Sequence, residues 1–244
     1  MSRSEETVSF SQRHEFLNPL CLPGTVDIFT PRRAILTALQ DHLSHFQGKV
    51  LDIGCGSKPY RPLLFSPPSR VENYVGLDVR NGIYQQPDVE WNGRTMPFDD
   101  NSFDCALATE VFEHCPDPEL VMKEAVRVLK PGGFLFFTVP FIWVLHEIPH
   151  DEYRYTPFSL ERHLRNAGFG QIQLKALGGM DASLAQVLGL WIGYRPIAYW
   201  KRWILSRLVV PVVRFLLAHD QLPQRFDNSV MITGLSGTAV KPAR

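Results

Sequence analysis

Three acidic residues follow stretches of apolar residues that are typical of buried strands. Asp52 and Asp78 each end such a stretch, and Glu110 comes shortly after another. Because the carboxyl ends of parallel strands meet at one edge of a sheet, we expect the three carboxylates to face one crevice. An acid there disfavours a phosphate ligand, which prefers bare N–H groups and a nearby cation. The pattern favours a ligand that is cationic or rich in hydrogen-bond donors.

Two glycines follow Asp52 and predict a tight turn in which the backbone approaches a ligand closely. They are Gly54 and Gly56, with Cys55 between them. The dinucleotide-binding pattern, G-x-G-x-x-G opening a helix, is not completed, because Gly56 is followed by Ser57, Lys58, Pro59 and Tyr60, and this weakens that interpretation. We expect Lys58 to be a solvated surface charge or, alternatively, to reach an anionic substrate.

A second group of polar side chains lies at 146–156 and carries the candidate catalytic residues. Histidine is suited to general base catalysis near neutral pH, so His146 and His150 are the candidates, with Asp151 as an orienting partner. Alternatively, an Asp151–Arg154 ion pair and histidine-to-backbone bonds only hold the loop together. A metal site on His146, His150 and Asp151 fits the spacing, but no further ligand is evident.

Strand and helix patterns alternate along the chain, which predicts an α/β doubly wound sheet. Expected strands lie at 49–53, 74–78, 88–91, 103–108, 134–139, 171–177 and 230–233. Expected helices lie at 30–46, 117–130 and 156–167. Thr30 followed by Pro31 predicts the start of the first helix. The last strand is expected at an edge of the sheet.

Residues 182–225 break this pattern and form an apolar, cationic segment. It contains three tryptophans and no acidic residue between Asp181 and Asp220, and Pro211 should kink or divide its helix. Two interpretations stay open: a lid or homodimer contact, and a segment at a membrane surface, chiefly 186–219, where Trp and Arg are favoured. We therefore expect an N-terminal extension (1–30), a core (31–181 and 226–240) and a helical insertion (182–225).

Composition excludes some classes of protein. Lys and Arg total 25, as do Asp and Glu, so the net charge is near zero and broad electrostatic binding to nucleic acid is not expected. The four cysteines form no CxxC pair, which indicates reduced thiols rather than zinc or disulfides. The polar N-terminus lacks a signal-peptide core, and no stretch approaches the length of a membrane span. A cytoplasmic protein is expected, with peripheral contact at the inner membrane surface as the alternative.

Five segments in order along 50–139 give the chain a family resemblance. They are Val50–Gly56, Gly76–Asp78, Met96–Phe98 with Ser102–Asp104, Glu110–His114 and Arg127–Gly133. In sequence and spacing they resemble class I S-adenosylmethionine-dependent methyltransferases of the small-substrate, type 11-like bacterial group. The resemblance implies a Rossmann-like, seven-stranded, mostly parallel sheet and S-adenosyl-L-methionine as cofactor.

The resemblance also implies roles for individual residues. Asp78 would accept the ribose hydroxyls, and Gly54, Cys55 and Gly56 would lie along the methionine and ribose portions. Asp52 would interact with the cofactor's ammonium group, directly or through water, or else cap a helix or loop. Further along the chain, Asn92 would accept from the adenine amino group or be an ordinary turn residue, Met96 would pack on adenine, and Glu110 would face the methionine side.

The acceptor is less well defined by the sequence. The 146–156 loop resembles a subset carrying a His…Pro-x-Asp-x-Tyr-Arg-x-Thr signature, associated with glycans and specialised metabolites, and this makes Asp151, Tyr153 and Arg154 candidates for substrate binding. We expect O-methylation of a small molecule, sugar or lipid-linked glycan. The alternatives are N- or C-methylation of a small metabolite, and a scaffold that binds the cofactor without catalysis.

Overall fold

The centre of the structure is a seven-stranded sheet, as the alternating pattern predicts. The computed structural model describes residues 16–79 and 87–243, so the polar residues 1–15 of the expected N-terminal extension lie outside the described part. The strand order is β3-β2-β1-β4-β5-β7-β6. The order reverses at β1 and β4, which is where doubly wound sheets bind their ligands.

The strands at the centre of the sheet are almost fully apolar. The bounds are β1 Gln47–Ile53, β2 Arg70–Val79, β3 Val89–Trp91, β4 Phe103–Thr109, β5 Leu129–Pro140, β6 Gly170–Ala176 and β7 Gly234–Val240. β1 pairs in parallel with β2 and β4, β2 with β3, and β4 with β5. Burial is continuous along the C-terminal parts of β1 and β5 and nearly so along β4, as expected where helices cover both faces of a parallel sheet.

β7 runs antiparallel to β5 and lies inside the sheet. Lys241, just past its C-terminal end, bonds to Gly132 and Gly133 early in β5, whereas Thr233, just before its start, accepts from Phe141 beyond the end of β5. The prediction of an edge strand at 230–233 is therefore wrong in two respects. The strand begins at Gly234, and it lies between β5 and β6 rather than at an edge of the sheet. Its small residues explain the difference, because they leave room for the large aromatic side chains of β5.

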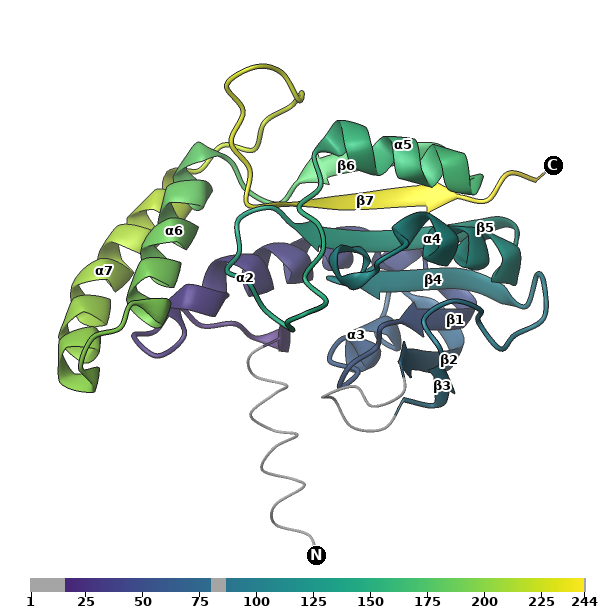
Figure 1. Ribbon diagram of the computed structural model, residues 1–244, viewed down its shortest axis with the longest axis horizontal. Coiled ribbons are helices and arrows are strands. Elements are labelled where there is room, and N and C mark those ends of the chain that lie inside the picture. The colour runs from purple at the N-terminus through teal and green to yellow at the C-terminus, as the bar shows by residue number, and fades with distance from the viewer. Residues whose placement is uncertain (1–15, 80–86, 244) are drawn as a thin grey trace, which may run out of the picture. The chain divides into compact units, whose positions relative to one another are not determined.

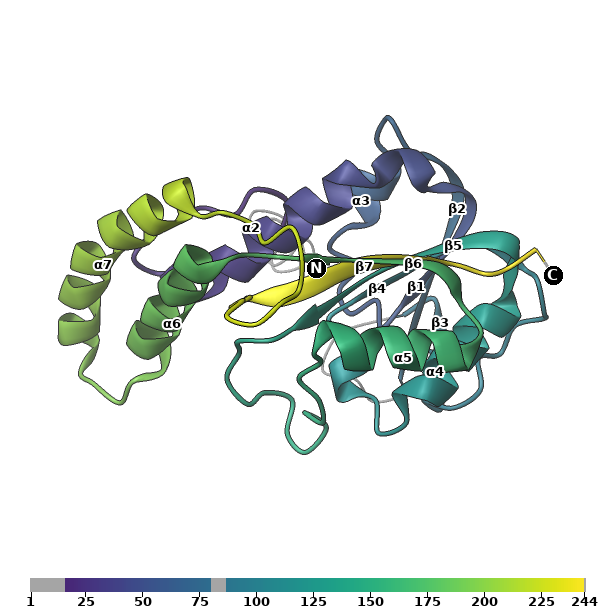
Figure 2. The same cartoon turned by 90° about the horizontal axis from the view of Figure 1, so that it is seen from above.

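Helices lie on both faces of this sheet. α4 (Pro118–Val128) and α5 (Pro157–Ala167) pack together on one face, and α3 (Arg61–Leu64) lies on the other (Figure 2). Both longer helices begin as the sequence predicts: Asp117 accepts from the Leu120 N–H, and Thr156 accepts from the Ser159 N–H. α4 ends two residues earlier than expected, because β5 already starts at Leu129.

The chain divides into two compact units. The sheet unit comprises the described residues of 39–140, 145–175 and 236–244, and the helical unit those of 1–38, 141–144 and 176–235. In the helical unit α6 (Met180–Tyr194) and α7 (Tyr199–His219) form an antiparallel pair (Figure 1). Its core contains Cys21, Val26, Phe29, Ala185, Val210 and Val213.

Two helix predictions are corrected by this core. α2 (Val26–Asp41) starts before Thr30, because the first turn places Val26 and Phe29 in the core, and a 3-10 turn at Leu43–His45 follows in place of the expected helix end at 46. α7 continues through Pro211 as one helix, so the predicted division is wrong. Val210 and Val213, both buried, anchor it on either side of the proline.

Candidate cofactor and acceptor site

The glycine loop after β1 takes a backbone conformation that the two glycines make accessible. Gly54 and Gly56 have φ values of 64° and 49°, in the left-handed region. A Cβ on Gly54 would lie 2.6 Å from a methyl carbon of Val111, so the loop packs directly on the segment after β4. The Cys55 N–H donates to the Leu77 carbonyl, which ties the same loop to β2. The loop thus has a fixed path at the switch point of the sheet.

Asp78 completes this turn from the neighbouring strand. Its Oδ2 accepts the Gly56 N–H at 2.8 Å, and its Oδ1 accepts the Val79 N–H at 2.7 Å. Each carboxylate oxygen has a second lone pair, so the group can still accept from a ligand. The pairing of acid and glycine loop predicted from sequence is therefore a direct contact.

Asp52 lies deeper than the other acids. Its side chain is buried, and the Tyr74 hydroxyl on β2 donates to its Oδ2. Burial raises the pKa of the Asp52 carboxyl to about 7, the Tyr74 hydrogen bond opposes this, and the negative charge of Asp78 adds to it. No pattern in the sequence indicates Tyr74 as a partner. Asp52 therefore contributes to the floor of the crevice.

Lys58 forms an ion pair rather than being a solvated surface charge. Its Nζ lies 2.5 Å from Oδ1 of Asp88, whose Oδ2 accepts the Gly76 N–H at 2.7 Å. Lys58 itself has a φ of 57°, in the left-handed region that a glycine would take freely. The ion pair thus connects the glycine loop to Asp88, which is itself hydrogen-bonded to β2 through Gly76.

The adenine-side residues have partners within the protein. The Asn92 side-chain oxygen accepts the backbone N–H groups of Arg94 and Thr95, both at 2.9 Å, which is the geometry of an ordinary turn residue. Met96 is buried, and its backbone bonds to Glu124 and Arg127. The turn role of Asn92 is present in the structure, and an adenine contact would use the remaining capacity of its amide.

The segment after β4 carries two carboxylates with different surroundings. Glu110 has a φ of 55°, and its Oε1 accepts the Thr138 hydroxyl at 2.8 Å. Glu113 is fully buried, and neither of its oxygens has a hydrogen-bond partner among the described residues. Burial, and then the charge of Glu110, raise the pKa of Glu113 well above its usual range. Glu113 belongs to the Glu110–His114 motif, but the sequence does not indicate that its carboxylate is buried without a hydrogen bond, with Nε2 of His114 at 3.7 Å.

The loop at 145–156 is built around one ion pair. The Asp151 side chain is 2 % exposed and pairs with both terminal nitrogens of Arg154, at 2.6 and 2.9 Å. Oδ2 of Asp151 also accepts the His146 N–H at 3.1 Å and lies 3.3 Å from Nδ1 of that ring. The guanidinium, and burial opposing it, set the Asp151 pKa to about 2. The predicted Asp151–Arg154 pair is confirmed, and the same carboxylate orients His146.

The other candidates in this loop have structural contacts. His150 is exposed, and its carbonyl rather than its ring bonds to Nδ1 of His114 at 3.0 Å. The Tyr153 hydroxyl donates to the Pro116 carbonyl, and its ring stacks on Tyr155. Of the two histidines, only His146 has the carboxylate partner that a general base needs.

Hydrogen bonds and ring contacts connect this loop to the glycine loop. The Glu113 carbonyl accepts the N–H groups of Glu152 and Tyr153, at 2.9 and 3.1 Å. The His114 and His146 rings meet edge to face at 4.6 Å. Because the segment carrying Glu113 and His114 also packs on Gly54 through Val111, the candidate base and the glycine loop belong to one continuous site in the sheet unit.

Comparison with known proteins agrees with this geometry. Residues 51–137 match the methyltransferase domain family. A ubiquinone biosynthesis O-methyltransferase from Chromobacterium violaceum is 30% identical over 178 residues, which cover 59% of this chain and 73% of that protein. The chain belongs to the class I S-adenosylmethionine-dependent methyltransferases. S-adenosylmethionine is accordingly its methyl donor.

Other similar proteins cover a range of chemistry. A sterol 24-C-methyltransferase from Gibberella zeae is 39% identical over 100 residues, covering 35% of this chain and 26% of that protein. Among solved structures, a possible histamine N-methyltransferase from Thermotoga maritima has a TM-score of 0.55 at 15% identity, covering 97% of this chain and 95% of that one. The [4+2]-cyclase SpnF has a TM-score of 0.56 at 21% identity, covering 88% and 84%. These two structures share the fold, and the acceptor is left open.

The methyltransferase crevice fits the cofactor it must hold. The glycine loop has no side chain where Gly54 meets Val111, and Asp78 presents a carboxylate at the end of β2 that can accept two hydroxyls. Glu110 supplies negative charge beside the loop, and Asp52, whose pKa is about 7, ionises there near neutral pH, which suits an ammonium and a sulfonium. When bound, the cofactor supplies an electrophilic methyl group; the protein has to hold it and position the acceptor.

A second set of ligand atoms lies next to the candidate base. One ligand atom each from Glu113, His114 and His146 lie within 4.8 Å of one another, close enough to hold a metal ion. This trio differs from the His146, His150 and Asp151 set that spacing suggested. His114 and His146 each engage Nδ1 with an oxygen partner, an arrangement that orients histidine ligands in metal sites.

The helical unit has a hollow of its own. An open groove of about 370 Å³ is lined by Val144, Val187, Leu190, Trp191, Tyr194 and Arg195. Apart from the arginine head group and the tyrosine hydroxyl, its walls are hydrocarbon or aromatic. The groove suits an apolar group better than a polar one.

Proposed function

We propose that this methyltransferase transfers its methyl group to an oxygen atom, on a small molecule, a sugar or a lipid-linked glycan. The arrangement of His146 against Asp151, with Arg154 completing the pair, is the observation that carries the proposal. An alcohol or phenol must lose its proton during the transfer, and a histidine oriented by a carboxylate is suited to accept it. The relative from Chromobacterium violaceum is itself described as an O-methyltransferase.

The proton transfer follows from the contacts of His146. Asp151 faces Nδ1, which favours the tautomer with hydrogen on Nδ1 and makes Nε2 the basic nitrogen of the ring. Bound S-adenosylmethionine would supply the methyl group and would keep the electron pair of the broken C–S bond on its sulfur, while Nε2 of His146 would accept the proton that the acceptor hydroxyl loses. The resulting imidazolium is stabilised by the Asp151 carboxylate, which its low pKa keeps ionised at neutral pH.

Positioning of the acceptor and the methyl donor is the protein's second contribution to the rate of transfer. Methyl transfer requires oxygen, carbon and sulfur in line, and holding two reactants in that geometry supplies much of the acceleration. The Glu113 carbonyl fixes the loop through Glu152 and Tyr153, so the base cannot drift from the glycine loop.

Transfer of labelled methyl from S-adenosylmethionine tests this proposal. The acceptor panel contains catechol-type phenols and monosaccharides, with amines of the same skeletons, and mass spectrometry locates the added methyl. We expect methyl ethers, and a drop of about 100- to 10,000-fold in rate for His146→Gln with unchanged cofactor affinity. His163→Gln is the matched control, since His163 on α5 also faces a carboxylate, that of Glu119 on α4 at 3.6 Å. Methylation confined to nitrogen or carbon, or a fully active His146→Gln, would contradict the proposal.

A further inference from the structure

α7 is apolar on two opposite faces, and the core explains only one of them. Ser206, Val210 and Val213 are buried, and the valines belong to the core of the helical unit. On the outer side a row of large apolar side chains is exposed. This outer stripe contains Trp200, Ile204, Leu208, Val212 and Phe215, which are 62, 44, 65, 46 and 61 % exposed. Their spacing of three or four residues places them along one side of the helix.

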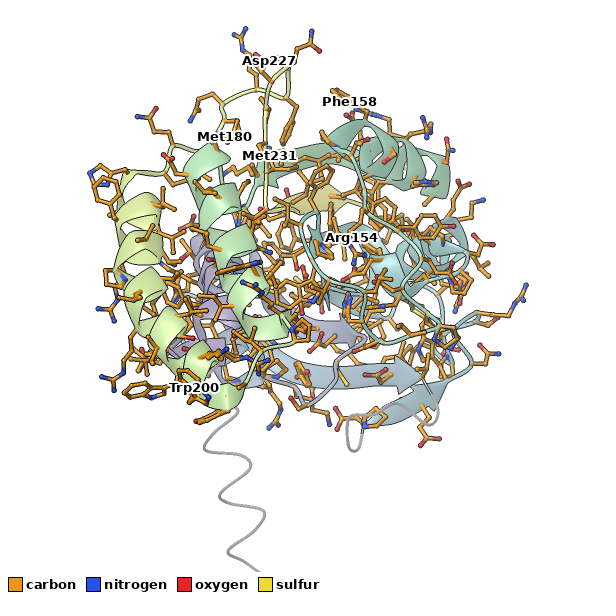
Figure 3. The ribbon with its side chains drawn as sticks, turned by 60° about the vertical axis from the view of Figure 1, so that its left-hand side comes forward. Arg154, Phe158, Met180, Trp200, Asp227 and Met231 are labelled. Atoms are coloured by element: carbon orange, nitrogen blue, oxygen red, sulfur yellow. The ribbon has the colours of Figure 1, made fainter. Side chains whose placement is uncertain are left out.

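Cations accompany the outer stripe. Lys201 lies over the ring of Trp200 at 5.4 Å, and the Arg207 guanidinium lies over the ring of Trp203 at 3.8 Å. Both cations are exposed, whereas Arg214 donates to the Cys21 carbonyl and is held within the unit. Trp200 lies at the start of α7 (Figure 3), and Tyr199, which precedes it in sequence and is 80 % exposed, adds a third aromatic ring. Aromatic rings and long cationic side chains side by side are typical of the boundary between headgroups and acyl chains.

Charge decides between a lipid surface and a second copy of the chain. The sequence from 182 to 219 contains five Arg and Lys residues and no Asp or Glu. Two-fold pairing through the outer stripe would bring Lys201 and Arg207 of both copies into one interface to which 182–219 contributes no acidic residue, and like charges in contact oppose association. An anionic bilayer complements the same surface. None of the helices in the described part of the chain is long and apolar enough to cross a membrane, so the helix would lie along the surface.

We propose that the outer stripe of α7 binds the surface of an anionic phospholipid bilayer. The apolar side chains enter the level of the upper acyl chains, and Lys201 and Arg207 contact lipid phosphates. Binding is then reversible and depends on both the anionic lipid fraction and the salt concentration. This proposal does not rest on which atom is methylated.

Flotation of the full-length protein with vesicles tests the proposal. Vesicles of phosphatidylcholine alone and of phosphatidylcholine with about 30 mol% phosphatidylglycerol are compared at low and high salt. We expect binding to the anionic vesicles only, weakened by salt. Lys201→Gln with Arg207→Gln should weaken it about 30-fold, and Leu208→Ser with Phe215→Ser should reduce it to background.

Matched variants elsewhere on the surface distinguish vesicle binding through the outer stripe from non-specific binding to vesicles. Phe158→Ser on α5 removes an apolar side chain that is 67 % exposed, and Lys175→Gln with Arg162→Gln removes two exposed cations. These should bind vesicles as the unaltered protein does. Circular dichroism and binding of S-adenosylhomocysteine show that each variant is folded.

Two results would overturn the proposal. One is no flotation with either vesicle, or flotation that Phe158→Ser reduces as much as the stripe variants do. The other is a dimer, seen by light scattering without lipid, that Leu208→Ser with Phe215→Ser converts to monomer while vesicle binding is absent. That second result would assign the outer stripe to a second copy of the chain.

Discussion

Replacing Asp52 by asparagine should change how the stability of the protein depends on pH. The pKa of Asp52 is raised to about 7 in the folded protein, against 3.8 for an ordinary aspartate, chiefly because the carboxyl is buried. A raised pKa means that the folded state prefers the protonated form. The stability associated with this group is therefore fully present below about pH 4 and is lost as the pH rises towards and through 7.

The size of the effect follows from the two pKa values. A difference of about three pH units corresponds to about 4 kcal/mol in the free energy of unfolding, of which roughly 2.5 kcal/mol falls between pH 5 and pH 8. An asparagine side chain at this position would keep an acceptor for the Tyr74 hydroxyl and cannot ionise. The amide changes the free energy of unfolding by an amount that does not depend on pH. The free energy of unfolding of Asp52→Asn, relative to that of the unaltered protein, should therefore rise by about 2.5 kcal/mol from pH 5 to pH 8.

Urea unfolding followed by circular dichroism at pH 5, 6, 7 and 8 measures this difference. Asp104→Asn is the control. Burial, the largest single effect, would raise the pKa of Asp104, but the hydrogen bonds from the Lys130 side chain and the Lys49 N–H together outweigh it and lower the pKa. Its contribution is complete above about pH 4, so its difference from the unaltered protein should be flat from pH 5 to pH 8. A flat profile for Asp52→Asn as well would refute the reasoning that burial dominates at this carboxyl.

Three further substitutions test other parts of the structure. Gly54→Ala should weaken binding of S-adenosylhomocysteine at least about 10-fold by calorimetry, because φ is 64° and a Cβ would meet Val111 at 2.6 Å; unchanged affinity would show that the loop adapts. Gly237→Val should lower the free energy of unfolding by about 1–3 kcal/mol in urea titration, because even a Cβ would lie 2.3 Å from the ring of Phe137. A free energy of unfolding equal to that of the unaltered protein would contradict this. Arg127→Met should lower the thermal midpoint by several degrees in scanning calorimetry, because the guanidinium donates to two backbone carbonyls and two carboxylates; an unchanged midpoint would mean that solvent replaces those bonds.

The sheet and its two best-capped helices could be predicted because local and long-range signals agree there. Asp117 and Thr156 are strong N-caps followed by proline, and each starts its helix where expected. The start of α2 could not be predicted from its cap signal. Thr30 and Pro31 look like a helix start, yet burial of Val26 against residues far along the chain extends the helix towards the N-terminus.

The prediction of the last strand was wrong for a related reason. Val230–Thr233 has the composition of a strand, whereas Gly234–Val240 contains small residues of low strand propensity. Gly237 is required because β7 packs on the ring of Phe137 and on Leu174, which lie on other strands. Such a requirement depends on contacts across the sheet and leaves no pattern within the segment itself.

The candidate site shows the same division. Asp78 and the glycine loop were predictable, since their types and spacing reflect what the loop must do. The hydrogen bond from Tyr74 to Asp52, and the ion pair from Lys58 to Asp88, connect residues 22 and 30 positions apart. They depend on the register of β1 against β2, which the sequence alone does not define.

Titration calorimetry with S-adenosylmethionine and S-adenosylhomocysteine tests most directly that the crevice at Asp78 and the glycine loop holds the methyl donor. We expect the unaltered protein to bind both. Asp78→Asn should bind them at least about 10-fold more weakly, because a charged acceptor for the ribose hydroxyls is lost while the Gly56 N–H keeps an oxygen acceptor. Asp99→Asn, at an exposed position, should bind as the unaltered protein does. Absence of binding to both compounds, or equal affinity in Asp78→Asn, would contradict the account.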